Sequence, residues 1–150
     1  MTWESFAGNA LYLDSNIIIF SVEEGNPWSD QLRVLFRSID QGALQAFTSE
    51  LTIAEVLAKP MALGARDLIE KYDQLLATDS VVKVVLVDRT VLRAAAELRA
   101  QIGTKLLDAI HVATARLYAC NLFLTQDQDL GRKIGTELRW LQLTDIAENR

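Results

Sequence analysis

The 150-residue chain has little of the chemistry that builds disulfides and zinc sites, because it contains one cysteine and one histidine. A single cysteine excludes an internal disulfide and favours a reducing compartment, so we expect a cytoplasmic protein. Cys120 has no base beside it in the sequence and is expected to be a small buried hydrophobe. The single imidazole, His111, argues against a zinc site.

Long apolar runs and a basic leader are also missing. No apolar stretch approaches the roughly 20 residues of a membrane span. The first fourteen residues carry two acids and no lysine or arginine, which is unlike a signal peptide. Neither a glycine-rich phosphate-binding loop nor the G-x-S-x-G motif of serine hydrolases occurs. We therefore expect neither membrane insertion nor serine-type hydrolysis.

The composition is that of a globular domain, with 50% hydrophobic and 23% charged residues. The length suits one domain over residues 1–150. A net charge of −5 argues against a protein that coats nucleic acid through bulk charge. It does not exclude a nuclease, because carboxylates that hold a metal present a cationic centre to the substrate.

Short apolar segments alternate with amphipathic segments along the chain. The pattern predicts strands at residues 10–14, 43–49, 81–87, 121–125 and 138–143. It predicts helices at residues 29–40, 49–58, 64–77, 88–102 and 106–119. Pro60 is expected to end the second helix, and the polar residues 126–129 could, taken alone, form a solvated turn. This alternation indicates a three-layer α/β/α domain with a central, mainly parallel sheet.

Four carboxylates stand beside strongly apolar segments. They are Asp14 in LYLDSNIIIF, Glu55 in TSELTIAEVL, Asp108 in KLLDAIHVATA and Asp127 in FLTQDQDL. Burying a carboxylate is costly unless it is paired or holds a metal. Asp14 and Asp127 follow predicted strands, at the edge where α/β sheets bind ligands, and Asp108 lies in the first turn of a helix. These acids can therefore meet at one edge of the sheet.

Carboxylate oxygens are the ligands that Mg²⁺ and Mn²⁺ prefer. We predict that Asp14, Asp108 and Asp127 hold one or two such ions, and that Glu55 closes the site or orients the attacking water. Taken singly, each acid has a simpler interpretation. Asp108 could only offset a helix dipole, Glu55 could lie on the surface, and Asp127 could belong to a polar turn.

Several neighbours are weaker candidates. Ser15, Asn16 and Thr125 adjoin the acids and could hydrogen-bond a carboxylate, a metal-bound water or a phosphate. Asp129 is an alternative to Asp127 as the last ligand. His111 follows Asp108 by one helical turn and could touch the site, but we favour a packed or exposed position outside it.

These four segments resemble, in order and spacing, the four motifs of the PIN-domain family of metal-dependent ribonucleases, and within it the VapC toxins of toxin–antitoxin pairs. The resemblance covers nearly the whole chain. It implies a PIN fold, a Mg²⁺ or Mn²⁺ site, and endonucleolytic cleavage of RNA. It also implies a homodimer and a small antitoxin that blocks the acidic groove.

Two alternatives stay within this family. One is a catalytically silent PIN-like module that binds RNA or protein, and the other is an RNA-processing nuclease outside a toxin–antitoxin system. A receiver domain would need paired acids after the first strand, and a haloacid-dehalogenase-type phosphatase would need D-x-D where this chain has Asn16. The candidate RNA-binding cations are Arg93, Arg99, Lys105, Arg116, Arg132 and Lys133.

Overall fold

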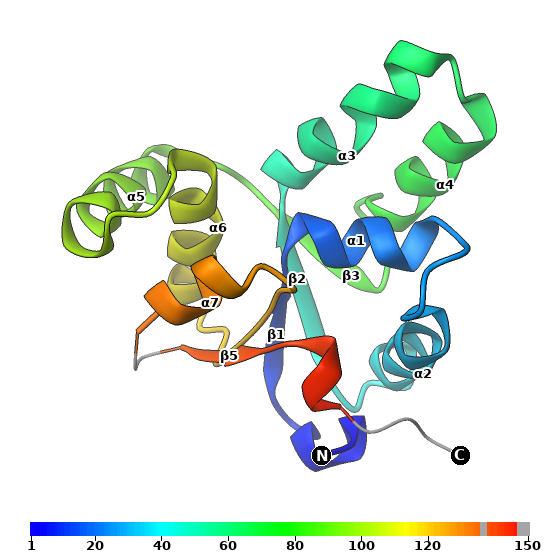
Figure 1. Ribbon diagram of the computed structural model, residues 1–150, viewed down its shortest axis with the longest axis horizontal. Coiled ribbons are helices and arrows are strands. Elements are labelled where there is room, and N and C mark those ends of the chain that lie inside the picture. The colour runs from blue at the N-terminus through cyan, green and yellow to red at the C-terminus, as the bar shows by residue number, and fades with distance from the viewer. Residues whose placement is uncertain (136–137, 147–150) are drawn as a thin grey trace.

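Five short apolar segments pair side by side in the computed structural model, which describes residues 1–135 and 138–146 (Figure 1). The strand order is β3-β2-β1-β4-β5, and each neighbouring pair is parallel. The strands are β1 (Ala10–Leu13), β2 (Gln45–Ser49), β3 (Val82–Val85), β4 (Leu122–Leu124) and β5 (Arg139–Leu141). All five lie within the predicted segments, with shorter bounds.

Helices cover both faces of the sheet, which confirms the predicted three-layer α/β/α class. One core lies under α1 (Ser15–Val22), α2 (Ser29–Asp40), α3 (Glu50–Leu63) and α4 (Arg66–Leu75). The other core lies under α5 (Arg89–Ile102), α6 (Leu106–Leu117) and α7 (Gln128–Lys133). Two short 3₁₀ turns, η1 (Trp3–Phe6) and η2 (Leu143–Asp145), complete the described elements. No described helix is both long enough and apolar enough to cross a membrane.

The central strand β1 shows how the sequence divides its side chains between the two cores. Leu11 and Leu13 point into the core under α1–α4, while Tyr12 points into the core under α5–α7. This follows from the two-residue period of a strand, since both faces of a parallel sheet are covered. The Tyr12 ring stacks on Phe123 of β4, with centroids 5.1 Å apart. Its hydroxyl is therefore fixed on the α6 side of the sheet.

One sequence-based expectation about helices was wrong. The helix α3 passes through Pro60 and ends at Leu63, where Gly64 adopts a φ of +64°. A proline removes one N–H and one helical bond, and here it is buried on the same apolar face as Val56 and Leu57, whose packing offsets that loss.

The polar segment at residues 126–129, for which a solvated turn was one interpretation, leads into a helix instead. Residues from Gln128 onward form α7, which begins where the Asp127 side chain accepts a hydrogen bond from the Leu130 N–H. Leu130 and Ile134 are both buried in the core that also holds residues of α5 and α6, so the short helix is stabilised by tertiary packing.

Candidate active site

Asp14 lies at the carboxyl end of β1, where the neighbouring strand β4 also ends. The register pairs Leu13 with Leu124, and the Asp14 N–H continues the ladder by donating to the Leu124 carbonyl at 3.1 Å. Asp14 is also the N-cap of α1, since its Oδ1 accepts the Ser15 N–H at 2.8 Å. Only 4% of Asp14 is exposed, so its carboxylate faces the interior of the sheet edge.

A polar network ties this carboxylate to the segment that follows β4. The Thr125 hydroxyl donates to Asp14 Oδ2 at 2.7 Å, and Asn16 Nδ2 donates to the same oxygen at 3.3 Å. Asn16 Nδ2 also donates to Thr125 Oγ1 at 3.1 Å, and that oxygen accepts the Asp127 N–H at 3.1 Å. Three of the neighbours predicted from the sequence thus contact Asp14: Asn16 and Thr125 through side chains, and Ser15 through its backbone.

Asp108 occupies the first turn of α6 and lines the same cavity as Asp127. Burial raises the pKa of Asp108, and the negative charges of Asp14 and Asp127 raise it further. Burial also raises the pKa of Asp14, against the lowering effects of His111 and of the hydrogen bonds from Thr125 and Ser15. The carboxylates are therefore close enough to repel one another.

Asp127 and Asp129, the two candidates for the last acid, have different surroundings. Both are exposed and help to line a cavity of about 280 Å³ that Asp108 also lines. Asp127 adds to the electrostatic crowding of Asp108, whereas Asp129 pairs with Arg132 at 3.2 Å on the outer side of α7. Asp127 is thus the better candidate.

The donor set fits a hard divalent cation. Within residues 1–135 and 138–146, no lysine or arginine lies within ion-pair distance of Asp14, Asp108 or Asp127. In the same residues no three acidic, histidine or cysteine side chains are grouped so that they could hold a metal ion by themselves. Mg²⁺ needs only one or two carboxylates and keeps several waters, so an open cluster of mutually repelling carboxylates suits it.

Glu55 reaches the cluster from α3 through the one histidine of the chain. His111 Nε2 lies 2.5 Å from Glu55 Oε1 and 3.9 Å from Asp14 Oδ1. His111 is fully buried on α6, which agrees with the favoured interpretation that it is packed. It contacts Glu55, however, so it does not lie outside the candidate site as that interpretation held. Its three-residue spacing from Asp108 puts both side chains on one face of α6, and this was the available sequence signal.

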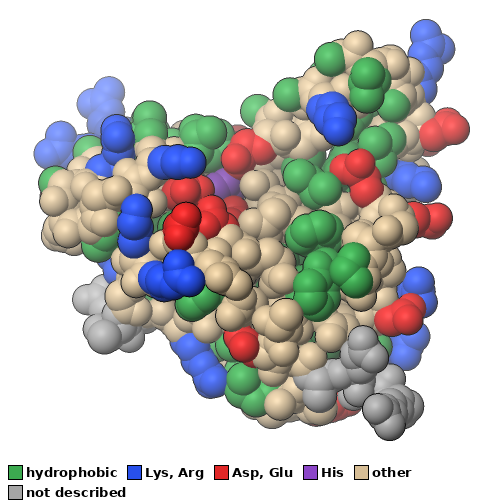
Figure 2. Space-filling view, viewed as in Figure 1, with side chains coloured by type: hydrophobic (Ala, Val, Ile, Leu, Met, Phe, Trp, Pro, Cys, Tyr) green, Lys and Arg blue, Asp and Glu red, His purple; other side chains and the backbone are tan. Residues whose placement is uncertain are grey.

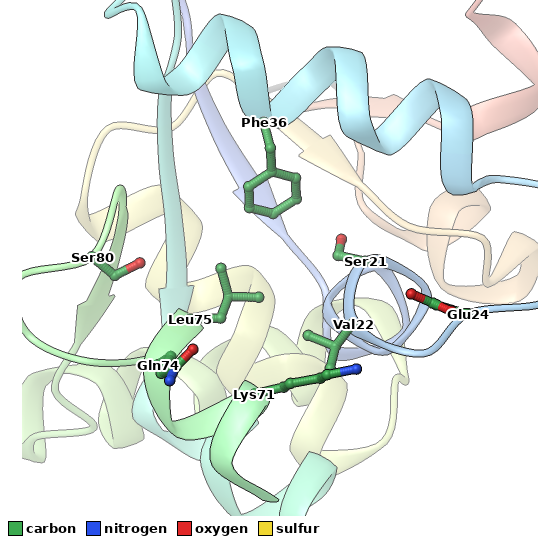
Figure 3. A pocket seen from close by; sticks show the side chains of 8 residues that line it. All are labelled: Ser21, Val22, Glu24, Phe36, Lys71, Gln74, Leu75 and Ser80. Carbon is green, nitrogen blue, oxygen red and sulfur yellow. The ribbon is translucent and has the colours of Figure 1, made fainter. Parts of the chain in front are cut away.

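Other described hollows lie away from these acids. Between α1, α2 and α4 is a pocket of about 480 Å³, and Figure 3 shows Phe36, Val22 and Leu75 around it together with Lys71 and Gln74. None of the four candidate acids lines this pocket. Figure 2 shows instead that Asp and Glu side chains gather in a separate hollow, with Lys and Arg side chains beside them near α5, α6 and α7.

Fold and site together define an α/β domain whose acidic side chains meet at the carboxyl edge of a parallel sheet. The PIN domain family matches residues 11–135, and the chain belongs to this family. The resemblance predicted from the four motifs is thereby confirmed. A comparison with curated proteins gave no significant sequence match.

Solved structures with the same fold are distant in sequence. VapBC2 from Rickettsia felis, bound to promoter DNA, matches with a TM-score of 0.70 and 13% identity over 89% of this chain and 98% of that chain. FitAcB from Neisseria gonorrhoeae matches with a TM-score of 0.69 and 15% identity, over 91% of this chain and 99% of that chain. VapC20 from Mycobacterium tuberculosis, a toxin that cleaves the sarcin–ricin loop, matches with a TM-score of 0.66 and 17% identity, over 86% of this chain and 98% of that chain.

Proposed function

We propose that this chain is a metal-dependent endoribonuclease and the toxin of a toxin–antitoxin pair. The observation that carries the proposal is that the charges of Asp14 and Asp127 act on Asp108. Within the described residues no lysine or arginine forms an ion pair with any of the three acids, although the charge of Lys105 partly offsets the repulsion at Asp108. Carboxylates that repel one another are costly, above all where one of them is buried as Asp14 is, and such clusters are characteristic of sites that bind cations. Membership of the PIN domain family supports the same chemistry.

The four acids divide into three metal ligands and one residue that orients the attacking water. Asp14, Asp108 and Asp127 hold Mg²⁺ or Mn²⁺, which when bound polarises a phosphoryl oxygen and lowers the pKa of water. Thr125 and Asn16 fix the orientation of the Asp14 carboxylate through their hydrogen bonds to Oδ2. Glu55, which is 25% exposed at its side chain, faces the solvent side of the cluster and orients the attacking water.

The substrate is RNA, and its backbone is expected to bind on the side of α6 and α7. Lys105, Arg132 and Lys133 line the same cavity as Asp108 and Asp127. Cations beside a metal site bind the phosphates that flank the bond to be cut, and they do so without a large positive charge on the whole protein.

Neutralising two of these cations tests the RNA track. We expect Lys105→Gln/Lys133→Gln to raise KM for RNA about five- to tenfold with kcat within about twofold, because phosphate contacts add to binding. The slope of log(kcat/KM) against log salt concentration should flatten by about 1.4, or about 0.7 for each lost contact to a single strand. Steady-state cleavage at several salt concentrations measures both.

The matched control removes two exposed cations from the opposite face of the sheet. Arg37→Gln/Lys71→Gln changes the net charge equally, on α2 and α4. It should leave KM and the salt slope unchanged within about twofold. If KM for RNA rose equally in the two double variants, bulk charge would bind RNA, and not the cations Lys105 and Lys133.

Replacing Asp127 and Asp129 separately by asparagine identifies which of them is the last metal ligand. We expect Asp127→Asn to lower the rate of RNA cleavage about 100-fold and Asp129→Asn to lower it less than about threefold, because only Asp127 adds to the crowding of Asp108. Asparagine keeps the helix cap at position 127, so the fold should persist. Cleavage rates at fixed Mn²⁺ concentration measure this, and the reverse ranking would assign the site to Asp129.

The partner we propose is a small antitoxin that blocks the acidic site, with the toxin acting as a homodimer in the cytoplasm. The structural neighbours that are toxin–antitoxin complexes motivate this assignment. The test is inducible expression in a bacterial host, beside cleavage of a structured RNA panel by the purified protein with Mg²⁺, Mn²⁺ or EDTA. Growth arrest with EDTA-sensitive cleavage supports the toxin; cleavage without arrest favours RNA processing; RNA binding without cleavage favours the silent module.

A further inference from the structure

We infer that His111, held by Tyr12, is a positioning residue that fixes the Glu55 carboxylate beside the acidic cluster. The inference rests on the nuclease function proposed above and assigns a role to two buried groups outside the acidic set. Three elements that are far apart in the sequence, β1, α3 and α6, supply the three side chains.

The contacts form a single chain of hydrogen bonds. The Tyr12 hydroxyl lies 2.6 Å from His111 Nδ1, and His111 Nε2 lies 2.5 Å from Glu55 Oε1. Both Tyr12 and His111 are 0% exposed. The Tyr12 ring meets the imidazole edge-on, with the ring centroids 5.7 Å apart, and it stacks on the Phe123 ring. Packing therefore fixes the Tyr12 ring, and the Tyr12 hydroxyl in turn fixes the imidazole.

The direction of these bonds follows from what each group can donate. An ionised carboxylate only accepts, so Nε2 carries a proton and donates to Glu55. The Tyr12 hydroxyl can donate to an unprotonated Nδ1 or accept from a protonated one. Burial by itself lowers the pKa of His111, but the bond to Glu55 and the charges of Asp14, Glu55 and Asp108 outweigh it and raise that pKa. The bond to Glu55 is present in either protonation state.

Glu55 needs such a donor. Its long side chain reaches toward acids that repel it, and in the described part of the chain His111 is its one hydrogen-bond partner. The imidazole N–H also faces Asp14 Oδ1 at 3.9 Å, so it offsets repulsion between the two carboxylates. Without this N–H, Glu55 would gain rotamer freedom and move away from the cluster, and a displacement of about 1 Å can cost roughly 100-fold in rate.

The experiment compares His111→Leu, which removes the donor, with His111→Gln, whose amide nitrogen can replace Nε2. We expect His111→Leu to lower kcat about 30- to 100-fold, with KM for RNA and the Kd for Mn²⁺ (from the electron paramagnetic resonance of free Mn²⁺) within about threefold. His111→Gln should recover kcat to within about tenfold of wild type. Tyr12→Phe, which frees the imidazole to rotate, should lower kcat about fivefold.

A double variant separates positioning from a general structural role. If His111 acts through Glu55, then Glu55→Gln/His111→Leu should be no slower than Glu55→Gln alone within about twofold. The inference would be overturned if the loss of kcat in the double variant equalled the product of the losses in the two single variants. It would also be overturned if His111→Leu kept the wild-type kcat. Thr114→Val is the control on the same helix, since this buried hydroxyl donates only to the Ile110 carbonyl, and it should keep the wild-type kcat.

A second readout does not need activity. In the metal-free protein, an imidazole N–H bonded to a carboxylate gives a far-downfield proton resonance, which should vanish in Glu55→Gln and in His111→Leu. If wild type lacks this signal, the inference is overturned whatever the cleavage result. If wild type has the signal but cleaves no RNA, the contact stands and the proposed nuclease function fails.

Discussion

Replacing Asp14 by asparagine is expected to lower metal-dependent RNA cleavage by about a thousandfold or more. Asp14 is the most buried of the four acids, at 4% exposure, and its carboxylate is oriented by Thr125 and by the Ser15 N–H. Loss of one such ligand removes several kcal/mol of electrostatic stabilisation from the transition state, and each ~1.4 kcal/mol is tenfold in rate. Asp108→Asn is expected to act in the same direction for the same reason.

The fold should survive this change. Asparagine caps a helix about as well as aspartate does, so α1 keeps its N-cap. Burial raises the pKa of Asp14, which means that its ionised form costs stability in the absence of a cation. Removing this charge therefore stabilises the fold, which offsets the hydrogen bonds from Thr125 and Asn16 to Oδ2 that an amide nitrogen cannot accept. We expect the free energy of unfolding in EDTA to change by no more than about 1 kcal/mol.

Purified wild type and Asp14→Asn are compared on the same RNA panel with Mg²⁺, Mn²⁺ or EDTA, and by urea denaturation. Asp30→Asn is the control, because this exposed acid pairs with Arg33 on α2, outside the site. It should cleave like wild type, and bacteria that express Asp14→Asn should grow while those that express the control arrest. Cleavage retained by both Asp14→Asn and Asp108→Asn would remove the basis of the proposed site.

The meeting of the acids could be anticipated because it depends on local features. Asp14 follows an apolar strand directly, and Asp108 stands in the first turn of a helix. In a parallel sheet the ends of neighbouring strands lie at one edge, so the positions of elements along the chain were enough to bring these side chains together. Their roles as ligands and catalysts remain predictions.

The histidine and the last helix could not be anticipated in the same way. His111 contacts Glu55 across 56 positions of sequence, and that contact depends on how α3 and α6 are placed on opposite faces of the sheet. The helix α7 is too short to show a clear period, and its stability comes from burying Leu130 in the core that it shares with α5 and α6. Both features depend on tertiary packing, to which local propensity gives little access.

The packing of α7 against β5 also fixes the segment that carries Thr125 and Asp127. The Trp140 indole N–H donates to the Thr125 carbonyl at 3.1 Å, and the Thr125 hydroxyl holds Asp14. Beneath the indole is Gly131, where a Cβ would lie 2.1 Å from Trp140 Cε2. The glycine is therefore required by the close approach of the ring to the helix backbone.

Gly131→Ala is expected to destabilise the protein by about 2 to 3 kcal/mol and to lower cleavage at least tenfold. Alanine favours a helix by about 1 kcal/mol, but overpacking costs about 3 kcal/mol when the obstacle is a ring that cannot fold away. Displacing the indole breaks its bond to the Thr125 carbonyl and moves the Asp127 cap, so the loss of activity accompanies the loss of stability. Urea denaturation in EDTA measures the first effect and RNA cleavage the second.

A double variant decides whether the ring is the cause. Trp140→Leu removes the obstacle, so Gly131→Ala/Trp140→Leu should be more stable than the sum of the single changes predicts, by about 1 kcal/mol or more. Gln128→Ala, an exposed change on the same helix, should leave both stability and cleavage near wild type. Additive losses would place the clash elsewhere. Full stability in Gly131→Ala would show that α7 can shift without cost, and Asp127 would then not be held firmly enough to act as a fixed ligand.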